Sequence, residues 1–230
     1  KGYQGFLQLF GVSLAGGHGS GEAWLDVGAR RVTKLVTRND FSDVLLRSST
    51  PGSTATPVLL QRVQGLTGYR HSGTDWRMDV PTLTITRAGA TQTLDGLSVA
   101  GGDHLSAAVA RIDLPMVASI AALSDRVPAG LARWLAEARP EGSLRDVRLA
   151  GSAEQPRVTA TADRVGFHAV GHAPGVSGVS GRIVGDRDGG ALAFDPASRF
   201  TFDWPSGFGV PHTYQPSGNI VWYRDGDGFG

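Results

Sequence analysis

The pair of side chains in this chain that comes closest to metal-ligand spacing is His168 and His172. On a helix, two histidines four residues apart share a face and can bind one metal ion. Residues 165–172 instead favour a strand that ends in a turn, where the two side chains lie about two pleats apart. No third ligand is evident nearby. The pattern therefore favours a strand histidine followed by a turn histidine, and no metal site is predicted.

Three glycine-rich segments resemble ion or phosphate loops in composition only. The Asp-Gly segments at 186–189 and 225–228 lack the third oxygen ligand and the distal Glu of a calcium loop, so hairpin turns are predicted there. Residues 17–21 lack the Lys of a phosphate loop. They precede a strand-like segment at 23–27, not a helix whose amides could bind phosphate, and this favours a hairpin turn or a flexible loop.

No arrangement of residues typical of nucleophilic or acid–base catalysis stands out in the sequence. There is no Cys, which excludes disulfides, thiolate chemistry and cysteine-bound metals. The Gly-Val-Ser-Gly segments lack the glycine that a nucleophile elbow needs two residues after the serine. No pair of carboxylates stands out. With 22 basic and 21 acidic residues and no basic stripe, the chain also gives no sign of a nucleic-acid partner. We expect no enzyme activity, no catalytic residue and no cofactor.

Tryptophan side chains offer one further chemistry, because indole rings on a strand face can stack on sugars. The commoner role of tryptophan is packing in a core or an interface, and we favour it here. The five tryptophans are Trp24, Trp76, Trp134, Trp204 and Trp222.

A short glycine-containing motif recurs along the chain. It occurs at 63–69 and at 176–182, and a third copy begins at 217–222 and is then cut off. The first two copies are followed by alternating, aromatic-bearing runs at 76–80 and 192–204. A recurring unit of strands argues for an extended, repetitive β architecture.

Alternation of apolar and polar residues predicts strands through most of 22–113 and 143–223, with turns at pairs such as Gly16-Gly17. Between them the period becomes helical, and prolines suit the first turns of two short helices. We therefore predict a mainly β fold, an extended, curved antiparallel sheet (a β-groove or gutter) with two short helices near 115–138. We expect a first β-repeat block at 1–114, a helical insert at 115–140, and a second block at 141–230 that includes the truncated third unit.

The strands have one apolar and one polar face. Trp76, Met78 and Val80 alternate with Arg77 and Asp79, and the run 200–204 alternates in the same way. In a sandwich, a second sheet covers the apolar face. In an open, curved sheet, that face could hold lipid tails. The alternation fits both arrangements.

Several segments together resemble the AsmA-like YhdP family of Gram-negative bacteria. They are 128–135 (PAGLARWL), 140–149 (PEGSLRDVRL), 162–167 (ADRVGF) and 174–183 (PGVSGVSGRI). The Gly65-Leu66-Thr67-Gly68 motif with its trailing Trp76 fits as well. The resemblance covers most of residues 22–225, and its motifs are short and structural.

The resemblance implies a section of a very long, bridge-like lipid-transfer protein. Such proteins have an inner-membrane helix and a periplasmic body whose repeated β units form an apolar gutter. The family is implicated in carrying phospholipid from the inner to the outer membrane and in maintaining the outer-membrane barrier. The expected partners are phospholipid acyl chains, and anchoring in the inner membrane would come from a segment outside these residues. The alternative is a structural or adhesive β-repeat protein whose apolar faces are packed together.

Physical chemistry then suggests which residues line the groove. Burying a lipid tail gains about 0.8 kcal/mol per CH₂ group, so rows of large apolar side chains suffice. A one-residue error in register would swap the faces. The helices are expected on a sheet edge or partly over the gutter, with Trp134 in the core. The predicted groove-lining residues are Trp76, Met78, Val80, Leu83, Ile85, Leu192, Phe194, Phe200, Phe202, Trp204, Ile220 and Trp222.

Overall fold

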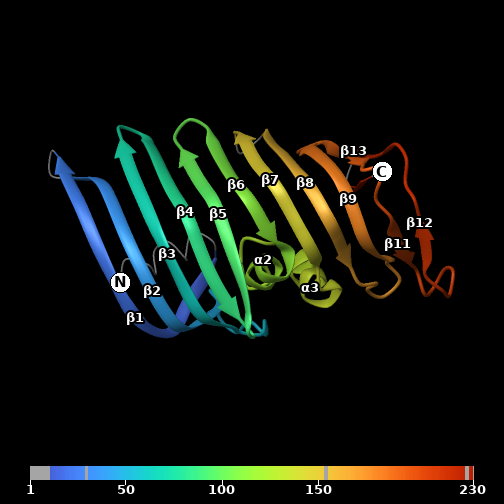
Figure 1. Ribbon diagram of the computed structural model, residues 1–230, viewed down its shortest axis with the longest axis horizontal. Helices are drawn as coiled ribbons and strands as arrows, with labels where there is room; N and C mark the ends of the chain where they lie inside the picture. Colours follow the sequence, from blue (N-terminus) through green and yellow to red (C-terminus); the bar gives the residue numbers. More distant parts are fainter. Residues whose placement is uncertain (1–10, 29–30, 153–154, 226–227, 230) are drawn as a thin grey trace.

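A single antiparallel sheet makes up most of the molecule (Figure 1). The computed structural model describes residues 11–28, 31–152, 155–225 and 228–229. In this part of the chain, fourteen strands join one sheet, and every strand from β1 to β10 pairs with the next along the sequence. Figure 1 shows these strands side by side as an open, curved sheet, with two helices near its middle, at one end of the strands. The predicted fold class is confirmed.

The first strands are long and the last are short. Those before the helices are β1 (Val12–Gly28), β2 (Arg31–Ser48), β3 (Val58–Ser72), β4 (Asp75–Arg87), β5 (Ala90–Gly101) and β6 (Leu105–Asp113). The helices are α2 (Leu114–Ala121) and α3 (Ala129–Ala138). The strands after them are β7 (Glu141–Gly151), β8 (Pro156–Phe167), β9 (Gly175–Asp186), β10 (Gly189–Phe194), β11 (Phe200–Asp203), β12 (His212–Tyr214), β13 (Asn219–Asp225) and β14 (Gly228–Phe229).

The expected turn at Gly16-Gly17 and the expected loop at 17–21 are wrong, because β1 runs straight through both. Register shifts against β2 absorb the irregular backbone around Gly16 and Gly17, and Gly17 has a φ of 139°. A Cβ placed on Gly19 would lie 2.7 Å from the Phe41 ring. These glycines therefore permit bulges and close approach within a strand, and do not end it.

One row of residues crosses the sheet from β1 to β10 and ends on β13. Residues directly opposite each other on paired strands carry their side chains on the same face. The row is apolar or glycine throughout, apart from the hydroxyl of its one tyrosine, and it defines what we call the apolar face. Its members are Leu25, Leu35, Tyr69, Met78, Val99, Ala107, Leu149, Val158, Gly185, Gly190 and Trp222.

β-Bulges keep the apolar residues of a strand on this face. Leu149 pairs with Val158 and Leu144 with Ala162, while the register shifts by one residue between them. Asp146, with a φ of 49°, lies within this shift. Without the extra residue, Leu144 and Leu149 would point to opposite faces, because side chains alternate along a strand.

The two helices cover the apolar face near the middle of the sheet, at one end of its strands. Met116 of α2 and Leu123, just after it, pack with Leu46, Leu60 and Ile85 from the sheet. Pro115 lies in the first turn of α2, as predicted, whereas Pro128 is the N-cap of α3, one residue before its predicted place in the first turn. In Figure 1 the rest of the sheet extends beyond the helices on both sides. Of the two expected placements, the structure shows partial cover of the sheet face.

Candidate functional site

The five predicted groove residues of β4 lie on the apolar face, although the strand contains a bulge. Met78 is in the row that crosses the sheet, and Trp76 and Val80 lie two residues to either side of it. Leu83 and Ile85 follow a register shift and join the cluster formed with Met116. The first three residues lie outside the cluster formed with Met116, and Met78 and Val80 among them are buried, at 7% and 5% exposed. The last two lie where α2 covers the face.

The predicted residues of β10 and β13 lie opposite one another on the same face. Leu192 pairs with Ile220, and Gly190 pairs with Trp222. A Cβ placed on Gly190 would lie 2.4 Å from the Trp222 indole, so the ring lies directly across the glycine. Ile220 is 51% exposed, so the apolar face is open at this end.

An aromatic cluster extends the apolar face onto β11 and β12. The rings of Phe194 and Phe200 are stacked with centroids 5.6 Å apart, and those of Phe202 and Trp204 meet edge to face at 6.4 Å. The Trp204 indole N–H donates to the carbonyl of His172 at 2.8 Å, which fixes the ring at the turn after β8. All twelve predicted groove residues thus lie on one face. Their contact with lipid stays a prediction.

Sequence reasoning missed three members of this cluster. The ring centroid of Phe208 is 5.6 Å from that of Trp204, and the centroid of Tyr214 is 5.6 Å from that of Phe200. His212 lies beside Phe208, with centroids 5.4 Å apart. These residues fall outside the alternating runs. The β11–β12 pairing places Tyr214 opposite Phe200 and His212 opposite Phe202, and no pattern in the sequence marks this pairing.

The opposite face of the sheet carries ion pairs. Arg62 donates two hydrogen bonds to the Asp40 carboxylate, at 3.0 and 2.8 Å, and Arg77 lies 2.8 Å from Asp79. The hydrogen bond from Arg62 is the main reason that the pKa of Asp40 is lowered. The pKa of Asp79 is likewise lowered, first by its hydrogen bond from Arg77. The two faces therefore differ sharply, one apolar and the other charged.

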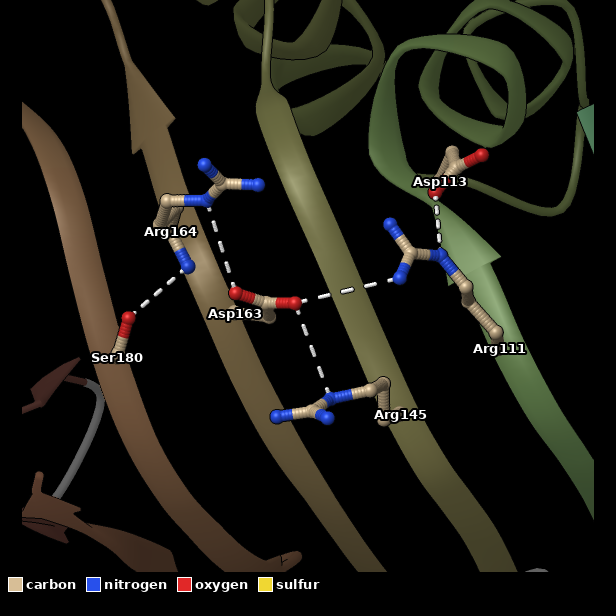
Figure 2. A network of polar contacts seen from close by, with 6 residues as sticks. All are labelled: Arg111, Asp113, Arg145, Asp163, Arg164 and Ser180. Atoms are coloured by element: carbon tan, nitrogen blue, oxygen red, sulfur yellow. Dashed lines mark hydrogen bonds and ion pairs between the residues drawn. The ribbon is translucent and has the colours of Figure 1, made fainter.

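A second ionic network lies on β6, β7 and β8 (Figure 2). The Asp163 carboxylate has three guanidinium neighbours, at 4.0 Å from Arg111, 3.8 Å from Arg145 and 3.7 Å from Arg164. Arg111 also contacts Asp113 at 3.1 Å. Two carboxylates thus face three guanidinium groups, and the network keeps an excess of positive charge.

The histidine and Asp-Gly segments form turns. His168 donates its backbone N–H to Ala138 at 2.7 Å, in the turn after β8. The Asp186 carboxylate accepts from the backbone N–H groups of Asp188 and Gly189, which builds the predicted hairpin turn. The segment at 225–228 lies partly outside the described residues. In the part of the chain that the structure describes, no three His, Cys, Asp or Glu side chains gather to hold a metal, and no helix could span a membrane.

Comparison with known families agrees with this architecture. The model of the YhdP protein family matches residues 3–230. The chain belongs to the YhdP family. No curated protein and no solved structure gives a significant match. The resemblance seen in the sequence is therefore confirmed at the level of the YhdP family. The division at 1–114, 115–140 and 141–230 stays a prediction, since neither the fold nor the family match tests it.

Proposed function

We propose that this section of a YhdP-family protein holds phospholipid acyl chains on its apolar face as they pass between two membranes. The observation that carries the proposal is the uninterrupted row from Leu25 to Trp222. Adjacent strands lie about 4.8 Å apart, so this row extends for roughly 50 Å. One leaflet of a bilayer contributes roughly 15 Å of hydrocarbon, half of the total. The row is thus about three tails long, which suits a path better than a single pocket.

The chemistry of the face suits sliding. Each CH₂ group of a tail gains about 0.8 kcal/mol when it leaves water, whichever apolar side chain it touches. The row offers almost no hydrogen-bonding side chain that would hold a lipid in one place. Leu25 and Val158 are 57% and 37% exposed, so parts of the face far from the helices remain open to a guest. A lipid could therefore move along the row without a large change in free energy.

The fold favours this function over the structural alternative. A purely structural β-repeat protein needs its apolar face packed under a second layer. In the residues that the structure describes, the strands form one sheet and two short helices cover only part of it. We further propose that the section works in the periplasm, carries phospholipid between inner and outer membrane without catalysis, and supports the outer-membrane barrier. Anchoring in the inner membrane would come from a segment elsewhere in the protein.

The test is lipid retention in variants matched by strand face. The Phe202→Asp/Trp204→Asp double variant places charge in the aromatic cluster, on β11 and just after it. The control, Thr159→Asp/Thr201→Asp, adds the same charge to the polar face of β8 and β11. Native mass spectrometry with lipid extraction of the whole protein should find phospholipid on the wild type and the control, with most of it lost from the first variant. A lipid-free wild type, or equal lipid on all three proteins, would contradict the proposal.

A further inference from the structure

The sheet opens between β5 and β6. These two strands pair only at one end, through Ser98–Ala100 and Ser106–Ala108. Each of them stays paired with its other neighbour along its whole length. β5 pairs with β4 as far as Ala90 opposite Arg87, and β6 pairs with β7 as far as Asp113 opposite Ser143. An open cavity of about 480 Å³ lies at this separation, next to α2.

The cavity reaches both faces of the sheet. Gln92 lies opposite Ile85, and Ile85 packs with Met116 under α2, so Gln92 and Met116 line the cavity from the apolar side. Arg111 and Asp163 line it from the charged side. The cavity therefore joins the apolar face to the ionic network of Figure 2.

Two buried polar side chains at this cavity have no hydrogen-bond partner. Gln92 is 6% exposed and Ser143 is 2% exposed. Neither the amide nitrogen and oxygen of Gln92 nor the hydroxyl of Ser143 makes a hydrogen bond. Each such group costs roughly 1–3 kcal/mol when it is left unsatisfied, so a buried pair beside one cavity points to a polar guest.

The charge around the cavity is positive. Arg87, Arg111 and Arg164 line it, and Arg145 contacts Asp163 from the adjoining strand. Against these four guanidinium groups stand the carboxylates of Asp113 and Asp163. Guanidinium groups bind phosphate oxygens through paired hydrogen bonds, so the excess charge favours a phosphate-bearing guest.

We propose that this cavity binds the phosphate headgroup of a phospholipid whose tails lie on the apolar face. This inference rests on the proposed function. It adds a side opening to the proposed lipid path along the apolar face, which we call the conduit. Arg111 and Arg164 meet the phosphate, while the Ser143 hydroxyl and the Gln92 amide bond the polar atoms between phosphate and tails. Met116 marks where the tails pass beneath α2. A site of this kind would admit or hold a lipid partway along the row.

The test compares three probes by isothermal titration of the whole protein. They are dihexanoyl-phosphatidylglycerol, dihexanoylglycerol with the same tails and no phosphate, and inorganic phosphate. The variant is Arg111→Gln/Arg164→Gln, and the control, Arg148→Gln/Arg157→Gln, removes two arginines from the same face of β7 and β8 outside the cavity. We expect the variant to weaken phosphatidylglycerol binding about tenfold or more, the control to leave it unchanged, and dihexanoylglycerol to bind both equally.

A second variant separates a binding role from a structural one. Gln92→Met keeps the length of the side chain and removes the unpaired amide, so the thermal midpoint of the lipid-free protein should rise while phosphatidylglycerol binds more weakly. A purely structural Gln92 would not give this opposite pair of changes.

The outcomes also separate the two proposals. Equal phosphatidylglycerol binding by wild type and the double-arginine variant overturns the headgroup site but does not contradict the proposal that lipid tails lie on the apolar face. Binding of inorganic phosphate as tightly as phosphatidylglycerol would assign the cavity to free phosphate and overturn the lipid assignment. If neither lipid probe binds the wild type, the proposed lipid-carrying function is itself contradicted.

Discussion

The indole of Trp134 in α3 meets the ring of Phe167 in β8 edge to face, with centroids 5.1 Å apart. Phe167 lies opposite Val176, which in turn lies opposite Phe202 of the aromatic cluster. Trp134 therefore packs on the apolar face itself, as the expectation of a core role implied. This contact holds α3 on the apolar face, which is exposed farther away at Leu25, Val158 and Ile220.

Removing this contact should uncover more of the apolar face. Trp134→Ala is expected to lower the free energy of unfolding by about 2 kcal/mol, below the range for a fully buried aromatic, and to increase binding of a hydrophobic dye. Leu131→Ala, at a position of α3 that is 47% exposed, is the matched control and should change both values little. Equal effects of the two substitutions would show that Trp134 does not anchor the helix.

Trp76 and Gly101 should be energetically coupled. A Cβ placed on Gly101 would lie 2.6 Å from the Trp76 ring, so Gly101→Ala must displace the indole and should cost about 1–3 kcal/mol. In a Trp76→Ala background the same substitution should cost much less. A double-mutant cycle by denaturant unfolding measures the difference, and additive effects would place the Trp76 ring elsewhere.

Acid should weaken the ion pair of Asp79. Its pKa is lowered from 3.8 in the folded protein, mainly by the hydrogen bond from Arg77. The stabilisation is therefore fully present above the unfolded value and is lost as the pH falls through the folded pKa. Asp79→Asn should cost roughly 0.2–1 kcal/mol at neutral pH and should make stability fall less steeply below about pH 4. Unfolding curves between pH 6 and pH 3 test this, and identical slopes would refute it.

Binding of an anionic headgroup at the cavity between β5 and β6 should depend on salt. The guanidinium groups of Arg111 and Arg164 have exposed side chains, 49% and 82%, so their attraction for phosphate is partly screened. Phosphatidylglycerol binding should weaken between 50 and 500 mM NaCl in the wild type and much less in Arg111→Gln/Arg164→Gln. The same salt dependence in both proteins would place the binding charge elsewhere.

Much of the groove could be predicted because a strand shows its two faces in its sequence. Met78 and Val80 alternate with charged residues, and their face follows from that pattern alone. Leu83 and Ile85 also lie on the predicted face, but a bulge that their sequence does not mark puts them there. In β1, Gly16-Gly17 looked like a turn, because glycine serves bulges and turns equally well.

The cavity between β5 and β6 had no local signal. Gln92 stands between two threonines, so its side of the strand cannot be recognised from alternation. Its burial depends on α2 and on where the pairing of β5 with β6 stops, and both are long-range features. Asp163 likewise gathers Arg111 from a strand about 50 residues earlier, a contact that no motif announces.

The central claim is that lipid tails follow the row across the sheet, and photo-crosslinking of the whole protein in cells tests it most directly. A photoreactive phenylalanine analogue would replace, one at a time, Met78, Val99, Leu149 and Val158 of the row, and their polar-face neighbours Arg77, Ala100, Arg148 and Thr159. We predict phospholipid adducts at the first four positions and few or none at the others. Adducts that are absent from the row, or equal on both faces, would contradict it.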